Sequence, residues 1–270
     1  MKKRLSLSNA IILTFVYIFM YAPLIVMVFF SFNSTNSTFD FSGFSIRWYK
    51  ELFSRSDILE AFRNTLVLAI LSSIIATIIG TIAAYGIYRT KSKLFSSALM
   101  TATNIPMMNP DIVTGVSLML LFVFVGRLAG ANSSLNFFTL LIAHVTFNIP
   151  YVILNILPKL RQTDIRLYEA AMDLGCTPVK AFFKVIMPAI APGIVSGLLM
   201  AFTLSLDDFV ISYYTSYGFQ TLPILIESMT RKRVKPDIYA LSSIIFVTIL
   251  ILLIISNIIQ SKSEKKDVKR

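Results

Sequence analysis

The sequence has a single cysteine, Cys176, which excludes an intramolecular disulfide and any cysteine-based metal site. Its one histidine, His144, has no second His or Cys at metal-ligand spacing. There is no G-x-x-x-x-G-K-[ST] run for binding ATP, and no Ser/His/Asp or Cys/His constellation. The sequence therefore predicts no enzyme activity, no cofactor and no resident metal.

Charged residues are also scarce, at 14% of the chain, whereas 56% of the residues are hydrophobic. This composition lies outside the range of soluble globular domains. The apolar residues form runs of about 20 residues or more, each long enough to cross the hydrocarbon core of a bilayer as a helix. We predict an all-α membrane protein with six transmembrane helices. The predicted spans are 10–32, 65–88, 94–125, 137–157, 189–211 and 238–259.

Two of these runs are unusual. The first follows a basic N-terminus, but it is longer than the core of a secretory signal, which has about 7–15 residues, and is predicted to be a membrane anchor. The third is interrupted by Pro106 and by the sequence Asn109-Pro110-Asp111. A straight helix in lipid does not readily accommodate these residues, so the third span is predicted to be broken or kinked.

The basic residues set the predicted orientation. The formal net charge is +11, and such a charge can indicate a nucleic-acid partner. Here 16 of the 25 Lys and Arg residues lie on the side of the two termini and nine on the other side, as the positive-inside rule requires of cytoplasmic segments. We therefore predict cytoplasmic termini and no nucleic-acid partner. Residues 1–260 are expected to form one membrane domain, with 261–270 as a disordered cytoplasmic tail.

The most informative segment is 163–188, between the fourth and fifth spans. Thr163 or Asp164 can cap a first short helix, and Gly175 suits its left-handed C-terminal position. Thr177 can cap a second helix, with Pro178 in its first turn and Pro188 at its end. The second helix has an apolar side, which needs a partner in a cytoplasmic loop. Its members are Val179, Phe182, Phe183 and Ile186.

Within this hairpin, the run Glu169-Ala170-Ala171, three residues, Gly175, and then Val185-Ile186-Met187-Pro188 resembles the E-A-A loop of permease subunits of binding-protein-dependent ABC importers. The resemblance implies the type I importer permease architecture. It also implies that the loop docks on a cytoplasmic ATPase. The residues carried over to that docking role are Glu169, Ala170, Ala171, Gly175 and Pro188. The alternative is an ordinary helical hairpin in an unrelated membrane protein.

Further segments extend the resemblance to the C-type permeases of the polyamine branch. The longest is Phe202-Thr203-Leu204-Ser205-Leu206-Asp207-Asp208, and others are Trp48-Tyr49, Pro110-Asp111 and His144-Val145. The resemblance implies a polyamine importer, for spermidine or putrescine, in the cell membrane. Its implied partners are two ATPase subunits, a second homologous permease and an extracytoplasmic polyamine-binding protein. Related permeases for other small solutes share parts of the pattern.

Ionisable residues inside membrane spans are costly and are candidates for function. Asp111 follows Asn109-Pro110, a predicted cap and first turn, and so would lie at the N-terminus of a half-helix. Asp207 and Asp208 lie near the outer end of the fifth span. Carboxylates and aromatic faces suit a chain of protonated amines, so we predict a substrate pathway. Its predicted residues are Asp111, Asp207, Asp208, Trp48 and Tyr213.

Structural alternatives remain for each of these residues. Asp111 could only cap a kinked helix, and the acid pair with its aromatic neighbours could be an interfacial belt. His144 is expected to be a neutral packing residue. Gly80, Gly86, Gly115, Gly193 and Gly197 are expected to allow close helix approach. The segment 222–235 is predicted to be an amphipathic surface helix with basic residues at 231–233.

Two other classes of function compete with the importer. A secondary transporter or channel would run on an ion gradient, but the cytoplasmic hairpin and the lack of an inverted repeat argue against it. A membrane enzyme would need a catalytic group, and none is present. Since the chain has no ATP-binding motif, the energy for transport must come from another subunit.

Overall fold

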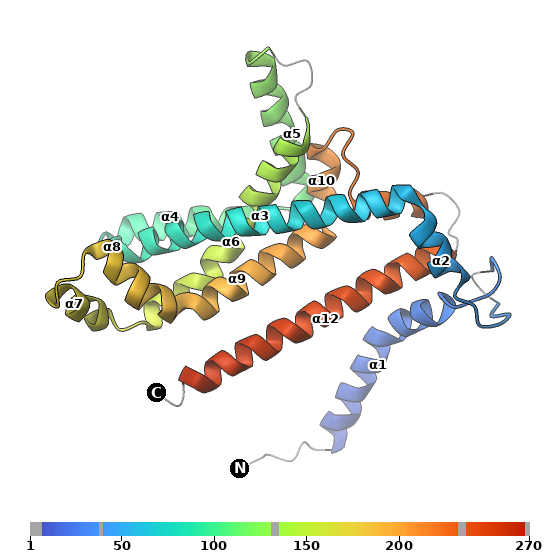
Figure 1. The fold of residues 1–270 in the computed structure, drawn as a ribbon, viewed down its shortest axis with the longest axis horizontal. Helices are drawn as coiled ribbons and strands as arrows, with labels where there is room; N and C mark the ends of the chain where they lie inside the picture. Colours follow the sequence, from blue (N-terminus) through green and yellow to red (C-terminus); the bar gives the residue numbers. More distant parts are fainter. Residues whose placement is uncertain (1–6, 38–39, 131–134, 232–235, 268–270) are drawn as a thin grey trace. The chain divides into compact units, whose positions relative to one another are not determined.

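A computed structural model describes residues 7–37, 40–130, 135–231 and 236–267, which are almost entirely helical (Figure 1). Among the described residues, five helices are long and apolar enough to span a membrane. A shorter apolar helical stretch, Asp237–Ile251, belongs to the last helix. The elements in chain order are α1 Leu7–Phe30, α2 Arg47–Ser54, α3 Ser56–Arg89, α4 Lys93–Met108, α5 Asp111–Leu128, α6 Phe137–Gln162, α7 Ile165–Asp173, α8 Pro178–Ala181, the π-helical turn η1 Phe182–Ile186, α9 Met187–Asp207, α10 Val210–Thr215, α11 Leu222–Thr230 and α12 Pro236–Asp267.

The chain divides into two compact units. One is formed by Met1–Leu59 with Ile226–Ile251, and the other by Glu60–Leu225 with Leu252–Arg270. We call the first the terminal unit and the second the central unit. The expectation that residues 1–260 form one membrane domain stays a prediction.

The terminal unit is organised by a short loop after α1. The buried amide of Asn33 donates hydrogen bonds to the carbonyl oxygens of Ser37 and Asp40, at 2.9 and 2.7 Å. The indole N–H of Trp48 on α2 donates to the Asn33 carbonyl oxygen at 2.6 Å. These bonds satisfy the polar groups of a loop that would otherwise be costly to bury. Arg55 further pairs with Asp237 at the start of α12, at 3.1 Å.

The core of the central unit lies where α6 packs along α9, with the second half of α3 against both. Small residues allow this approach. A Cβ atom added at Gly193 of α9 would lie 2.9 Å from the Asn155 carbonyl oxygen of α6, and one at Gly80 of α3 would lie 2.6 Å from Val152. In lipid the hydrophobic effect does not drive helices together. Close backbone contact of this kind instead stabilises their association through dispersion forces. The expectation for Gly80, Gly115, Gly193 and Gly197 is confirmed, but the expectation for Gly86 is wrong.

The contrast between two glycines gives a testable prediction. Gly193→Ala is expected to destabilise the protein by about 1–3 kcal/mol, because the new methyl group meets backbone that cannot rotate away. Gly86→Ala is the matched control, since a Cβ there meets no described atom within 4 Å. It is expected to stabilise α3 by about 0.5–1 kcal/mol through helix propensity. Thermal denaturation of the two detergent-solubilised variants measures the difference, and equal shifts would contradict the packing.

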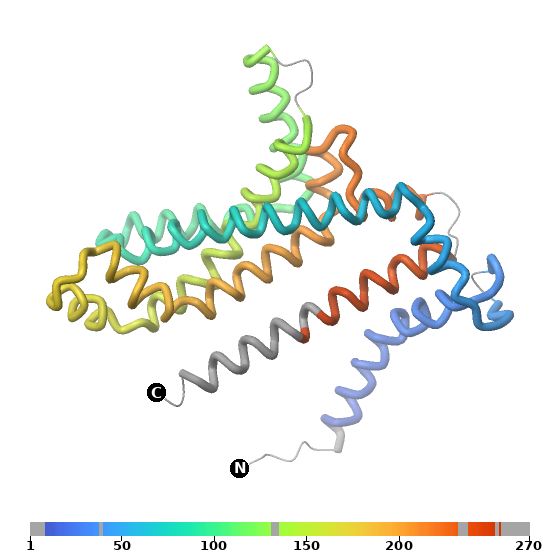
Figure 2. The backbone as a smooth tube through the Cα atoms, in the orientation of Figure 1, coloured from blue at the N-terminus to red at the C-terminus, as the bar shows by residue number. Residues whose placement is uncertain are grey.

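The predicted break in the third span is confirmed. α4 ends at Met108, α5 begins at Asp111, and the chain changes direction between them, as Figure 2 traces. Only α5 is long enough by itself to count as a candidate span. Near the other end of the unit, Pro188 does not end the second hairpin helix as predicted. Helical structure instead continues from α8 through η1 into α9, as one apolar stretch, Pro178–Asp207.

The π-helical turn explains why Pro188 is tolerated. The N–H of Met187 donates to the carbonyl of Phe182, five residues earlier, so the turn before the proline is widened. In an α-helix the proline ring would clash with the carbonyl four residues earlier, and its missing N–H would leave that carbonyl unpaired. In a π-helical turn the carbonyl groups accept from N–H groups five residues later instead of four, and the helix continues past the proline.

Other predicted boundaries also shift. α3 begins at Ser56, nine residues before the predicted span at 65, and α12 extends to Asp267, so most of the expected disordered tail is helical. The fifth span does not reach 211 unbroken, because α9 ends at Asp207 and Asp208 is extended. The predicted amphipathic segment contains α11, with Leu222 and Leu225 buried, whereas its residues 232–235 lie outside the described ones.

Candidate functional site

In the hairpin between α6 and α9, the two helix caps and the glycine turn lie where the sequence predicts them. The Asp164 side chain accepts a hydrogen bond from the N–H of Arg166 at 3.0 Å and caps α7. Gly175 has φ +86°, a left-handed conformation that other residues rarely adopt. Thr177 caps α8 by accepting from the N–H of Lys180. These local signals fix the turn between α7 and α8, which lies at the end of the central unit away from α5 and α10 (Figure 1).

Most of the predicted docking residues are exposed. Glu169, Ala170, Gly175 and Pro188 are exposed and Ala171 is half-buried. The apolar side of the second helix is divided by the packing. Phe182 and Ile186 turn inward, with Phe182 against the Tyr85 ring at 4.7 Å, whereas Val179 and Phe183 remain exposed together with Leu167 and Leu174. The hairpin therefore presents a carboxylate beside uncovered apolar side chains, which is the composition of a protein-docking surface.

Asp111 is the first residue of α5, so the prediction that it begins a half-helix is confirmed. The cap differs from the prediction, because Pro110 is the N-cap residue of α5 and Asn109 is the C-cap residue of α4. The carbonyl of Pro110 accepts from the N–H groups of Val113 and Thr114. The helix dipole favours a carboxylate at this position, and Asp111 is exposed there.

The adjacent residues Asp207 and Asp208 differ in their exposure to solvent. Asp208 is extended, so α9 stops and α10 starts after a short break. The Asp208 side chain is only 7% exposed and accepts hydrogen bonds from the N–H groups of Ile211 and Ser212, at 3.2 and 2.8 Å. It therefore holds the first turn of α10, whose N-cap residue is Phe209, and is enclosed by protein. Asp207, in contrast, is exposed.

A buried polar network surrounds Asp208. The Nε2 atom of His144 lies 3.4 Å from the Asp208 carboxylate and 2.9 Å from the Ser212 hydroxyl, and its Nδ1 lies 3.1 Å from the Ser205 hydroxyl. Ser205 in turn contacts Ser72 of α3 at 2.9 Å and accepts from the amide of Asn148 at 2.8 Å. His144 is thus a buried, hydrogen-bonded packing residue, as expected. The network ties α3, α6 and α9 to the start of α10.

Three side chains from different helices gather near the break. Asp111 of α5 lies within electrostatic range of both Asp207 at the end of α9 and Tyr151 of α6. Carboxylates and aromatic rings are groups that attract cations. This end of the central unit is opposite to the hairpin (Figure 1).

The two predicted aromatic residues differ in their settings. Tyr213 on α10 is exposed and its ring packs against Phe209 and Tyr214, at 5.5 and 5.4 Å. Trp48 belongs to the terminal unit, is buried, and uses its N–H to hold the Asn33 carbonyl. The structure accounts for Trp48 by packing, and we leave it out of the proposed pathway. The described residues contain no cluster of three or more His, Cys, Asp or Glu able to hold a metal ion.

A family model described as "Binding-protein-dependent transport system inner membrane component" matches residues 76–266 of this chain. The chain belongs to this family. It is a membrane transport subunit, a permease, and the matched region includes the whole hairpin and the carboxylate site. Because the family is defined by binding-protein-dependent transport, the permease works with a solute-binding protein and a separate ATPase.

Named relatives match almost the whole permease. It is 39% identical over 260 residues to the putrescine transport system permease protein PotI of Escherichia coli K12, covering 96% of this chain and 92% of the relative. It is 38% identical over 261 residues to the spermidine/putrescine transport system permease protein PotC of Haemophilus influenzae, covering 96% and 98%.

Solved structures agree on the fold. A bacterial ABC transporter that imports the acidic polysaccharide alginate matches with a TM-score of 0.73 at 16% identity, covering 96% of this chain and 95% of that one. The MetNI methionine ABC transporter matches with a TM-score of 0.57 at 15% identity, covering 77% and 93%. The type I importer permease architecture predicted from the sequence is therefore confirmed.

Sequence reasoning missed several polar contacts in this part of the central unit. Tyr151 was not selected, and the partners of His144 and Asp208 were not identified. A usable signal existed, because Ser72, Asn148 and Ser205 are polar residues inside apolar spans. Their partners lie 57–133 residues apart in sequence, so no local spacing could pair them.

Proposed function

We propose that this chain is the permease subunit of an ATP-driven importer for polyamines, spermidine or putrescine. The observation that carries the proposal is the 35–39% identity to putrescine and spermidine/putrescine permeases along 95–96% of the chain. The exposed carboxylates Asp111 and Asp207 supply chemistry that a chain of protonated amines requires.

In the proposed assembly, two ATPase subunits bind the cytoplasmic side of a permease pair formed with a second homologous permease. The excess of Lys and Arg on the side of the termini supports a cytoplasmic location for both termini and for the hairpin. An extracytoplasmic polyamine-binding protein delivers solute on the opposite face. The proposed location is the cell membrane.

Transport in this proposal is alternating access. Closure of the ATPase pair moves the hairpins, through Glu169, Ala170, Ala171, Gly175 and Pro188, and the permease pair turns from cytoplasm-facing to outward-facing. The binding protein then releases its solute, and hydrolysis resets the pair. The uncovered apolar side chains on α7 and α8 support docking there, because exposed apolar patches mark interaction surfaces.

The carboxylates have separate roles in this proposal. Asp111 and Asp207 contact the passing amines, with Tyr213 as an aromatic neighbour, because they are exposed at helix ends. Asp208 supports the pathway indirectly by holding the start of α10.

We expect Asp207→Asn and Asp111→Asn each to reduce polyamine uptake by about fivefold, since losing one attractive charge in a hydrated path costs about 1 kcal/mol. The measurement is radiolabelled spermidine and putrescine uptake by cells carrying the whole transporter. Glu60→Gln is the matched control, because Glu60 is an exposed carboxylate of the same unit outside this site. Its uptake is expected to equal wild type.

Membrane abundance and ATPase association must be unchanged for the comparison to count. Wild-type polyamine uptake in both aspartate variants would contradict the pathway. Absence of polyamine uptake by the intact transporter, with uptake of another small solute, would contradict the substrate class and leave the importer assignment in place.

A further inference from the structure

A basic pocket lies where α3 ends and α4 begins, beside the last turn of α6. Its volume is about 390 Å³. Two helices that meet here, Ser56–Arg89 and Phe137–Gln162, are long and apolar enough to span a membrane, and the pocket is at their ends. The ends of such helices lie at the level of the lipid headgroups. The pocket is therefore placed at a membrane surface.

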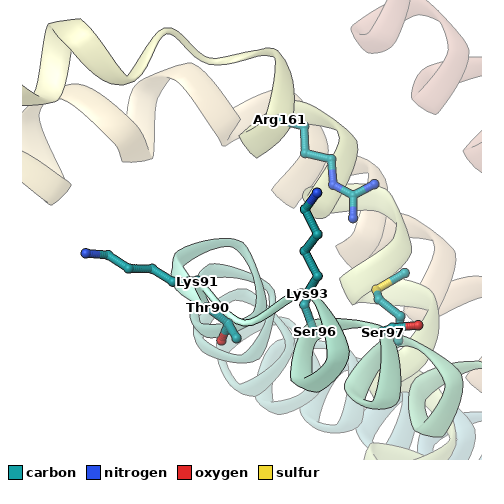
Figure 3. A pocket seen from close by; sticks show the side chains of 7 residues that line it. Thr90, Lys91, Lys93, Ser96, Ser97 and Arg161 are labelled. Atoms are coloured by element: carbon teal, nitrogen blue, oxygen red, sulfur yellow. The ribbon is translucent and has the colours of Figure 1, made fainter.

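The lining is rich in groups that bind anions. The lining has three cationic side chains, from Lys91, Lys93 and Arg161. It also has hydroxyl groups from Thr90, Ser96 and Ser97. Lys93 of α4 and Arg161 of α6 extend toward one another, whereas Lys91 points away from them (Figure 3). None of these cations forms an ion pair with a carboxylate in the described part of the chain. Two converging cations repel unless an anion lies between them.

The start of α4 adds to this preference. Ser92 caps the helix by accepting from the N–H of Phe95 at 3.3 Å, and α4 continues for 16 residues to Met108. The dipole of such a helix places partial positive charge at Lys93, on the wall of the pocket. Backbone and side chains thus favour the same sign of ligand charge.

Two apolar side chains beside the pocket indicate where the anion comes from. Leu94 and Phe95, the residues directly after Lys93, are 83% and 57% exposed. A free phosphate ion would meet the cations but would cover neither apolar side chain. A phospholipid would cover them with its acyl chains while its phosphate meets the cations.

We propose that this pocket binds the phosphate of an anionic phospholipid headgroup, held between Lys93 and Arg161. The lipid bridges α4 and α6 at the membrane surface and neutralises their converging charges. This inference does not depend on which solute is transported.

The test is native mass spectrometry of the purified whole transporter, titrated with phosphatidylglycerol and, separately, with zwitterionic phosphatidylcholine. The wild-type protein is expected to retain phosphatidylglycerol in preference to phosphatidylcholine. The double variant Lys93→Gln with Arg161→Gln is expected to bind phosphatidylglycerol at least about tenfold more weakly. The control, Arg63→Gln with Arg127→Gln, removes the same charge from exposed side chains outside the pocket and is expected to bind as wild type.

Three results would overturn the proposal. Equal loss in both double variants would mean that only net charge matters. Displacement of phosphatidylglycerol by millimolar inorganic phosphate would assign the pocket to a soluble anion. Unchanged lipid binding with loss of the ATPase subunit in the Lys93→Gln, Arg161→Gln variant would assign it to a protein contact.

Discussion

Replacing Glu169 with lysine is expected to lower solute uptake by roughly tenfold or more while the protein remains in the membrane. Glu169 is exposed on α7, so the substitution costs little in folding. On a docking surface, however, a reversed charge meets a partner surface shaped for a carboxylate, and the resulting repulsion costs several kcal/mol. The measurement is uptake together with co-purification of the ATPase subunit.

Asp173→Lys is the matched control for this variant. Asp173 is an exposed acid on the same helix but does not belong to the proposed docking set. It is expected to retain most of the uptake and ATPase association. If Glu169→Lys keeps both wild-type uptake and bound ATPase, the coupling role of the hairpin is contradicted.

The second large effect is expected at Asp208. Asp208→Ala should destabilise the permease by about 2–4 kcal/mol, because it leaves two buried N–H groups in the first turn of α10 and a histidine without their acceptor. Lower abundance in the membrane and a lower thermal denaturation midpoint in detergent are the expected results. Uptake per folded molecule should also fall, since α10 loses its anchor.

The neighbouring residue provides the control. Asp207→Ala changes an exposed carboxylate. It should leave the free energy of unfolding within about 0.5 kcal/mol of wild type while reducing uptake. Asp208→Asn should recover part of the stability, because an amide oxygen can still accept from one N–H of α10. Equal stability of Asp207→Ala and Asp208→Ala would contradict the division of roles between the two aspartates.

Local signals in the sequence were sufficient for much of the hairpin. Asp164, Gly175 and Thr177 act through hydrogen bonds and backbone angles within a few residues, which spacing can report. The break before Asp111 was likewise predictable from its proline. Pro188 shows the limit of the same rule, because a π-turn in the preceding residues absorbs the proline and no residue there signals it.

The roles of Asp207 and Asp208 could not be divided from the sequence. Adjacent helical residues point about 100° apart, but the side facing the protein depends on where the helix breaks. The break at Asp208 is marked by no proline or glycine, and it is stabilised by His144, more than 60 residues away in the chain. Gly86 illustrates the same point, since a glycine gives no sign of whether a partner helix passes it.

The most direct test of the importer assignment is polyamine accumulation in proteoliposomes containing the complete transporter and its binding protein. We predict accumulation of spermidine or putrescine that requires hydrolysable ATP on the side of the ATPase and survives collapse of the proton and sodium gradients. Accumulation that stops when the gradients collapse, and proceeds without ATP, would contradict the account and identify a secondary transporter.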